Sequence, residues 1–281
     1  MDRKPSCLKE RAAETKQAAR EVLGGHSGGL SHRLILTLAI IMIMTVSIAL
    51  YAAVACLAMA GGFILGDTVW VDAVSNALLV ALLLGLTLPL TVSLGRLACL
   101  MAAPDGEVVN GLAVTVPTPD LVQLFYPFSS FRAYGRTMAV GMEKLAFLMV
   151  GGGLPILVGR LVYISMVAAG IRPWICGLAV AGMVILGLAW GFFVLLLSGR
   201  RMGFSYFVFA HEELSLSDAN RYFRTLRRPV LAALRLRVGM LGAYALSLAG
   251  ICVPFVFHSV PLGLCCKAVY GRDLARSKNE N

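Results

Sequence analysis

The chain has 281 residues, of which 58% are hydrophobic and 14% are charged, and its net charge is +10. Soluble globular chains carry about 25% charged residues and about 45–50% apolar residues. A chain of this size cannot hide so much apolar surface from water, so the composition excludes an ordinary soluble protein. Lipid is the alternative solvent, and the sequence predicts an all-α, polytopic transmembrane helix bundle.

Residues 1–33 are polar and precede the first apolar run. Their basic residues are not followed closely by a short apolar core and a small-residue cleavage site, which argues against a cleaved signal peptide. We therefore expect residues 1–33 to form a cytoplasmic N-terminal segment with an amphipathic helix, and the first apolar run to be a retained anchor.

Five apolar runs are long enough for a membrane-crossing helix, which needs about 20 residues. They cover residues 34–60, 73–101, 145–170, 174–198 and 238–266. Each run must be helical, because an isolated strand in lipid leaves its backbone amides unpaired. The sequence therefore predicts a transmembrane bundle over residues 34–266 with about five spans.

Lys and Arg accumulate in alternate connections between these runs. They are frequent in residues 1–33 and in the connections 102–144 and 199–237, whereas the connection 61–72 contains aspartate and neither Lys nor Arg. The positive-inside rule then places the N-terminus and both long connections in the cytoplasm. We expect a multi-pass protein of the cell membrane with a cytoplasmic N-terminus.

The last run leaves two topologies open. Five crossings would place the tail 267–281 outside the cell, yet this tail is basic, with Lys267 and Arg272 among its residues. The run is too short for two full crossings at about 20 residues each. A re-entrant or sixth segment, bent at Gly250 to Pro254, would instead return the tail to the cytoplasm.

Five polar or ionisable residues lie in or beside the apolar runs, namely Asn76, Arg96, Glu143, Lys144 and Arg160. An ionisable residue inside a span is costly and is therefore a functional candidate. A polar path near Arg160 would be typical of a transporter. The alternative is that Arg160 lies near the end of its helix and extends its guanidinium to the lipid headgroups.

The connection 199–237 contains a pattern that is typical of a basic amphipathic helix. Ser215 and Asp218 match a helix start, and apolar residues from Leu216 onward recur at helical spacing. Arg221, Arg224 and Arg228 fall on the opposite face. We expect this helix to lie at the membrane interface with its arginines on lipid headgroups. The alternative is a helix packed on a partner or under the bundle.

Small residues in two spans indicate close helix packing. Gly187 and Gly191 have the spacing that lets helices approach closely in lipid, either within the bundle or in a homo-oligomer. Gly151 to Gly153 precede Pro155, which predicts a local kink or unwound turn in the third span.

Three short stretches occur in order along the chain. Residues 16–26 end in Leu-Gly-Gly-His, residues 120–136 contain Asp-Leu-Val-Gln-Leu-Phe and then Tyr-Gly-Arg, and residues 206–215 end in His-Glu-Glu-Leu-Ser. Together they resemble an uncharacterised bacterial family of multi-pass integral membrane proteins, domain-of-unknown-function family nine hundred seventy-five. The third stretch lacks the family's proline and has His211 in its Asp position. The resemblance implies a bacterial membrane protein and no known activity.

The sequence contains no recognisable catalytic motif. The seven cysteines lack metal-ligand spacing, and no phosphate-binding loop is present. We expect a non-enzymatic protein without a cofactor, with a scaffold, assembly or envelope-associated role. A transporter or permease component for a small molecule or ion, with its path near Arg160, is the alternative. The expected partners are the lipid bilayer with its anionic headgroups, and a second copy or another membrane protein. Nucleic acid is not expected, because aromatic residues do not alternate with the basic ones.

Overall fold

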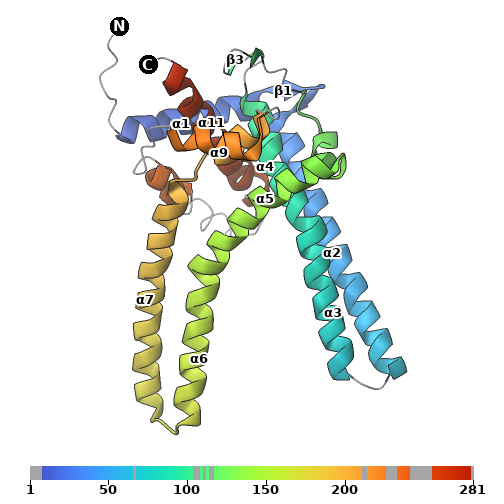
Figure 1. The fold of residues 1–281 in the computed structure, drawn as a ribbon, viewed down its shortest axis with the longest axis vertical. Helices are drawn as coiled ribbons and strands as arrows, with labels where there is room; N and C mark the ends of the chain where they lie inside the picture. The colour runs from blue at the N-terminus through green and yellow to red at the C-terminus, as the bar shows by residue number, and fades with distance from the viewer. Residues whose placement is uncertain are drawn as a thin grey trace.

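The computed structural model of the chain describes residues 8–65, 68–103, 108–109, 112–113, 117–210, 214–225, 233–240 and 255–279. Two long helical hairpins extend from one polar cap, and the cap contains the first and last helices, α1 (Leu8–Gly24) and α11 (Val260–Asn279) (Figure 1). Within the described residues, four helices are long and apolar enough to cross a membrane: His32–Ile64, Val69–Ala102, Phe131–Ala168 and Trp174–Ala210. The all-α bundle is confirmed, and these helices correspond to the first four predicted runs, although the third helix ends at Ala168, before residue 170.

The first hairpin is joined to α1 by a tight turn. Strands β1 (His26–Ser27) and β2 (Leu30–Ser31) pair antiparallel across Gly28 and Gly29, whose φ angles are +57° and +83°. Glycine suits this turn because other residues rarely adopt positive φ. His32 then fixes the end of α1, since its Nδ1 lies 2.7 Å from the carbonyl oxygen of Val22. The turn therefore sets the angle between α1 and the helix that follows.

The first hairpin consists of α2 (His32–Leu65) and a long return helix. The return helix is built from α3 (Thr68–Leu82), the π-helical turn η1 (Leu83–Thr87) and α4 (Leu88–Ala102). It has 34 residues within the candidate span, or about 51 Å at 1.5 Å per residue, against about 30 Å for the hydrocarbon core. The end of α4 therefore extends into the cap, where it is almost entirely buried.

The second hairpin begins earlier than the sequence predicts. The expected connection 102–144 contains the short strands β3 (Val108–Val109) and β4 (Leu112–Ala113), the 3-10 helix η2 (Leu121–Phe128) and most of α5 (Phe131–Leu148). Helix α5 starts at Phe131 because Ser130 caps it, its Oγ accepting a hydrogen bond from the Ala133 amide at 3.1 Å. The π-helical turn η3 (Met149–Gly153) and α6 (Leu154–Ala168) continue the same helix, and α7 (Pro173–Gly199) returns to the cap.

Each π-helical turn in the hairpins stands just before a proline, which lacks the amide needed to continue the hydrogen-bond ladder. Beside Pro89, the carbonyl oxygen of Gly85 accepts a hydrogen bond from the Tyr134 hydroxyl at 3.0 Å. Beside Pro155, the carbonyl oxygen of Val150 accepts one from Trp190 Nε1 at 2.8 Å. A side chain of a neighbouring helix therefore satisfies a carbonyl in each break, as backbone in lipid requires. The predicted irregularity beside Pro155 is present as η3.

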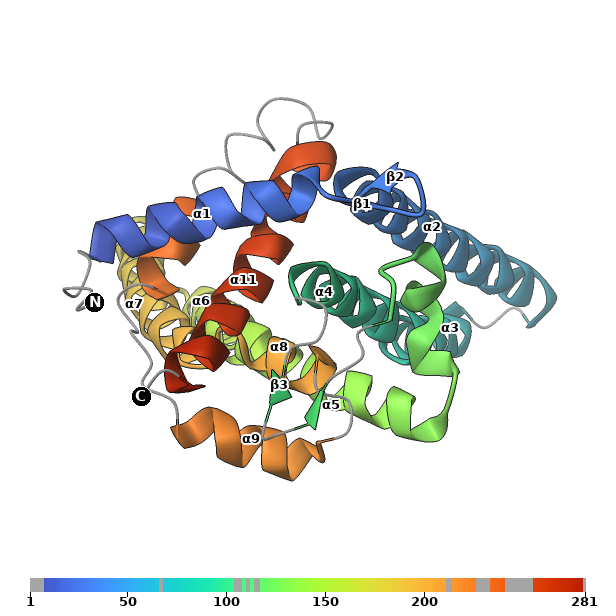
Figure 2. The same ribbon diagram turned by 90° about the horizontal axis from the view of Figure 1, so that it is seen from above.

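The cap packs short helices against the ends of the long ones. Helix α11 lies against α1 and α4, and α8 (Phe204–Ala210) lies against α4, α9 (Leu216–Thr225) and α11 (Figure 2). The buried face of α1 has Thr15, Ala19 and Leu23 at helical spacing. An aromatic cluster fastens α9 to α8, with the rings of Phe204 and Phe207 both 5.4 Å from Phe223. The hydrophobic core of the chain lies in this cap.

The last apolar run begins and ends in the cap. A helix over residues 233–240 contributes Leu236 and Met240 to the cap core, and η4 (Phe255–Ser259) leads into α11, where Cys265 and Cys266 are fully buried. Both described flanks of the run therefore lie in the cap, on the same side as α1. The bend expected at Gly250 to Pro254 lies outside the described residues.

The predicted tail is not a separate segment. The expected boundary between residues 266 and 267 falls inside α11, which continues to Asn279. The helix continues because Ala268, Val269 and Leu274 are buried in the cap core beyond that boundary. The basic residues of this segment therefore lie on the same side as α1.

Candidate functional site

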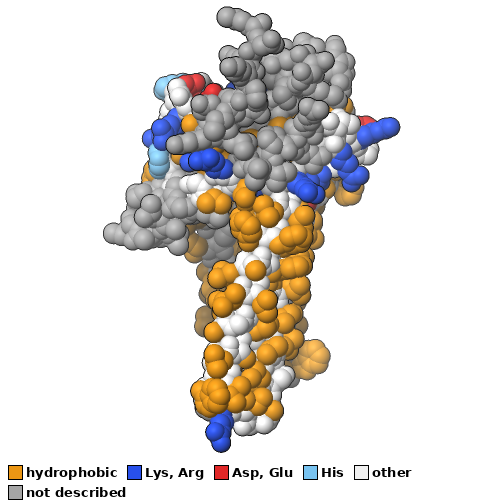
Figure 3. Space-filling view, turned by 90° about the vertical axis from the view of Figure 1, so that its left-hand side faces the viewer, with side chains coloured by type: hydrophobic (Ala, Val, Ile, Leu, Met, Phe, Trp, Pro, Cys, Tyr) orange, Lys and Arg blue, Asp and Glu red, His pale blue; other side chains and the backbone are white. Residues whose placement is uncertain are grey.

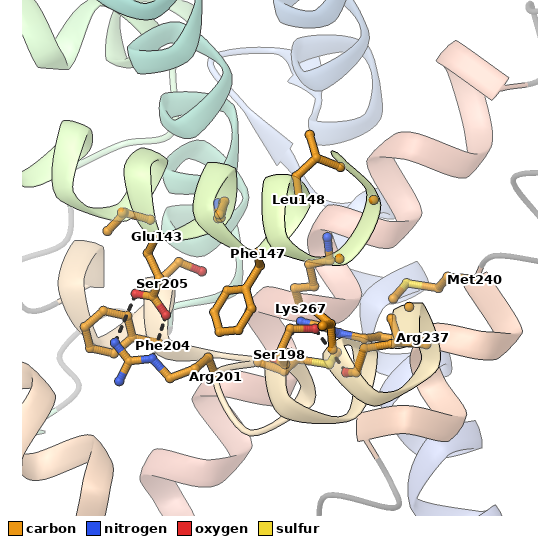
Figure 4. Close-up of a pocket in the computed structure, with 18 residues that line it drawn as sticks. Glu143, Phe147, Leu148, Ser198, Arg201, Phe204, Ser205, Arg237, Met240 and Lys267 are labelled. Carbon is orange, nitrogen blue, oxygen red and sulfur yellow. Dashed lines mark hydrogen bonds and ion pairs between the residues drawn. The ribbon is translucent and has the colours of Figure 1, made fainter. Parts of the chain in front are cut away.

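A cavity of about 460 Å³ lies where the second hairpin enters the cap (Figure 4). Helix α5 and the turn η3 form one wall, the end of α7 and the start of α8 form another, and helix 233–240 and α11 close the cap side. The hairpin contributes apolar and small side chains, including Phe147, Leu148 and Val194. The cap side contributes most of the charge, so the cavity is amphipathic.

One ion pair crosses the cavity wall. Glu143 of α5 receives two hydrogen bonds from Arg201, at 2.6 Å from Nε and 3.0 Å from Nη2. Arg201 also donates to Asn220 Oδ1 at 2.6 Å, and its guanidinium carbon lies 4.1 Å from the centre of the Phe204 ring. A bidentate, stacked guanidinium has a fixed geometry. This pair therefore ties α5 to the cap, and Glu143 is neutralised by Arg201.

A second guanidinium, that of Arg237, is held by neutral acceptors. It donates hydrogen bonds to Ser198 Oγ and, at 3.0 Å, to the Ser198 carbonyl oxygen at the end of α7. Its Nε is buried and has no hydrogen-bond partner within the described residues. Burial lowers the pKa of Arg237, as expected for a cation removed from water.

Two lysines complete the lining. Lys267 of α11 is half-buried, and Lys144 of α5 is exposed to the cavity. Burial, together with the nearby charges of Lys144 and Arg237, lowers the pKa of Lys267 to about 8. Neither lysine has a salt bridge to a carboxylate within the described part of the chain. Among the residues that the structure describes, the cavity lining therefore has four cations and one carboxylate.

The predicted polar residues do not converge on one path. Glu143 and Lys144 line the cavity, but Arg96 does not. Arg96 is 2% exposed; it donates to Gln123 Oε1 at 2.6 Å and lies 3.7 Å from the centre of the Tyr126 ring. Arg96 thus joins α4 to η2 inside the cap.

Asn76 and Arg160 are exposed on the apolar hairpins, on α3 and α6. Arg160 lines neither the large cavity nor the smaller apolar one between α6 and α7. The structure thus separates these two residues from Glu143 and Lys144, and the path that the sequence suggested is not assembled within the described residues.

The basic helix α9 packs its apolar face on protein. Ala219 and Phe223 are buried against the cap, whereas Arg221 and Arg224 are exposed on the other face. The alternative of a helix packed under the bundle therefore describes its apolar face, and the interfacial placement is wrong for that face. Contact of the exposed arginines with headgroups stays a prediction, and Arg228 lies outside the described residues.

The predicted packing glycines lie on α7, where they face α6 and η3. A Cβ added at Gly187 would lie 3.4 Å from Pro155 Cβ, and one at Gly191 would lie 3.7 Å from the Gly151 carbonyl oxygen. These glycines therefore allow close packing within the hairpin, and self-association through them stays a prediction.

Sequence reasoning missed Arg201, Arg237 and Lys267 as site residues, because it treated them as topological charge. Their nearness to the ends of apolar runs was visible, but their meeting with Glu143 and Lys144 depends on the folding of the cap. No family model, curated protein or solved structure matches the chain.

Proposed function

We propose that the protein is a non-enzymatic membrane scaffold of the cell membrane, with its cap in the cytoplasm and its two hairpins holding lipid or a partner membrane helix. The observation that carries this proposal is the pairwise packing of the spans. Helix α2 packs on α3 and α6 packs on α7, while the two hairpins diverge below the cap (Figure 1). The hydrophobic windows of the third and fourth spans are 0% and 6% buried.

The second hairpin presents an apolar surface along its length, and basic side chains gather at the cap (Figure 3). Helices whose apolar surface is exposed all round need lipid or other helices around them. A transporter would need a polar path between packed helices, and Asn76 and Arg160 stand apart from each other on separate hairpins. These observations support the scaffold over the transporter.

The basic cap supports the cytoplasmic orientation through the positive-inside rule. The likeness to the uncharacterised bacterial family is part of the same proposal, carried by its three short stretches.

Complementation of a strain that lacks the gene tests the proposal. The scaffold predicts that Arg160→Leu and Asn76→Leu restore the wild-type phenotype in full. It also predicts that Gly151→Leu fails, because a Cβ there already lies 3.0 Å from Val194 Cγ1 and would separate α6 from α7. Loss of function in Arg160→Leu, at normal protein levels, would favour transport and refute the scaffold.

A further inference from the structure

The cavity between the second hairpin and the cap has more positive charge than its structural contacts require. Glu143 is satisfied by Arg201, so among the described residues Lys144, Arg237 and Lys267 bring three further cations to the lining without a carboxylate of their own. Arg237 and Lys267 are half-buried, and removing a cation from water is costly unless opposite charge or hydrogen bonds offset it. The described residues supply little of this offset.

The protein's own partial charges compensate Arg237 only in part. The end of α7 presents carbonyl oxygens, and the negative end of its dipole favours a nearby cation. This accounts for one guanidinium, but Arg237 Nε is still a buried donor with no acceptor in the described part of the chain. Lys267 experiences the repulsion of Lys144 and Arg237 in addition to burial. An anion among these three groups would relieve all of these costs at once.

The remainder of the lining indicates what the anion is attached to. Phe147, Leu148, Val194 and Leu195 provide apolar walls, and the glycines of η3 leave room between them. This part of the lining belongs to the helices that continue into the apolar hairpin. The cavity volume of about 460 Å³ is within the range of about 300–1,000 Å³ that is common for ligand sites.

We propose that this cavity binds an anionic amphiphile, with its phosphate or carboxylate head against Lys144, Arg237 and Lys267 and its hydrocarbon chain along η3 and α7. The geometry favours a membrane lipid over a soluble anion, because the apolar half of the lining continues into the span. In Figure 4, Arg237 and Lys267 lie together on one side of Phe147, and the Glu143–Arg201 pair lies on the other. The site goes beyond the proposed scaffold role and does not depend on it.

The test measures lipid retained by the full-length protein in nanodiscs of phosphatidylcholine with and without phosphatidylglycerol. Native mass spectrometry after release counts the bound lipids. We expect the wild type to retain phosphatidylglycerol selectively. Arg237→Gln combined with Lys267→Gln should lower this retention by about tenfold or more, since each charge-assisted hydrogen bond contributes about that factor. Arg33→Gln combined with Arg132→Gln removes the same charge from exposed positions on α2 and α5 that do not line the cavity, and should leave retention unchanged.

A second variant keeps every charge. A Cβ at Gly152 would meet no atom within 4 Å, so Gly152→Leu fits the backbone and fills part of the cavity. It should also improve helix propensity, so loss of fold is not expected. Retention of phosphatidylglycerol should fall in this variant as well. Inorganic phosphate, added without lipid, is the probe for a soluble anion.

Three results would overturn the proposal. Equal retention of both lipids would exclude a selective headgroup site. An equal effect of the Arg33 and Arg132 control and the cavity variant would indicate general surface charge. Thermal stabilisation by inorganic phosphate alone, lost in the Arg237 and Lys267 variant and unaffected in Gly152→Leu, would assign the site to a soluble anion instead of a lipid.

Discussion

Replacing Gln123 by leucine should destabilise the protein more than replacing Arg96, the residue that it binds, by methionine. Arg96 is buried in the cap, and its Nη1 donates to Gln123 Oε1 at 2.6 Å. Gln123→Leu removes that acceptor and leaves a donor of a buried cation with one partner fewer. The half-buried Gln123, by contrast, can turn to water when Arg96 is replaced. The two changes are therefore not equivalent.

The structure gives the size of this asymmetry. A hydrogen bond to a charged group contributes about 1.5–3 kcal/mol, so Gln123→Leu should cost about 2–3 kcal/mol. Arg96→Met loses the same bond and the contact with the Tyr126 ring, but it also ends the burial of a charge. Because burial of an ion costs several kcal/mol, the net loss should be about 0–1.5 kcal/mol. The double variant should resemble Arg96→Met alone.

Thermal unfolding of the purified variants in detergent measures these free energies as a double-mutant cycle. Val122→Ala is the matched control, because Val122 lies beside Gln123 on η2 and is 70% exposed; its effect should stay within about 0.5 kcal/mol. If Arg96→Met proves the more destabilising variant, or if Gln123→Leu has no effect, the hydrogen bond does not hold α4 to η2.

Three further predictions concern other parts of the fold. Gly271→Ala should destabilise the protein by about 2 kcal/mol or more in the same assay, since its Cβ would lie 2.5 Å from Tyr206 Cβ. The control, Gly135→Ala, has open space at its Cβ and should be neutral or stabilising. If Gly271→Ala has no effect on stability, α8 and α11 are not closely packed. Trp190→Phe should cost about 1–2 kcal/mol of stability, because it leaves the Val150 carbonyl without its donor. Pro155→Ala should reduce this cost, because it restores a backbone amide beside that carbonyl. If the cost of Trp190→Phe is the same with and without Pro155, the tryptophan does not compensate for the proline. Lys267 makes stability depend on pH, because its pKa is about 8 in the folded protein against an ordinary value of 10.5. Between these two pH values the unfolded state binds more protons than the folded state. Stability should therefore rise with pH across this window. The groups that face Lys267 are Lys144 of α5, Arg237 of helix 233–240 and Cys266 of α11. Lys267→Met should flatten the rise of stability with pH. If the slope of stability against pH is unchanged, another group titrates.

The four spans were predictable because each is an apolar run of at least 25 residues with at most one charged residue. Lipid leaves such a run no other conformation than helix. The start of α5 was not predictable, because residues 131–144 are too polar to be recognised as a span. They become helical through the Ser130 cap and contact with α4. For the last run, a return to the cap was predicted only as an alternative to a fifth crossing. Its flanks are apolar because they pack in the cap, and hydropathy does not distinguish such burial from lipid.

The candidate site was half predictable for a similar reason. Glu143 and Lys144 stand out because they interrupt an apolar context. Arg201, Arg237 and Lys267 stand among other basic residues, and nothing local separates a cavity cation from a topological one. Asn76 and Arg160 had the clearest signal in the sequence, and the structure places both away from the cavity.

One cap contains both ends of the described chain, and both hairpins point away from it (Figure 1). Single cysteines in a cysteine-free background, labelled from each side of sealed vesicles, test this claim directly. Glu14→Cys in α1 and Asp273→Cys in α11, both exposed, should react from the same side, and Ile171→Cys at the turn between α6 and α7 should react from the opposite side. Labelling of Asp273→Cys from the side of Ile171→Cys would contradict the account.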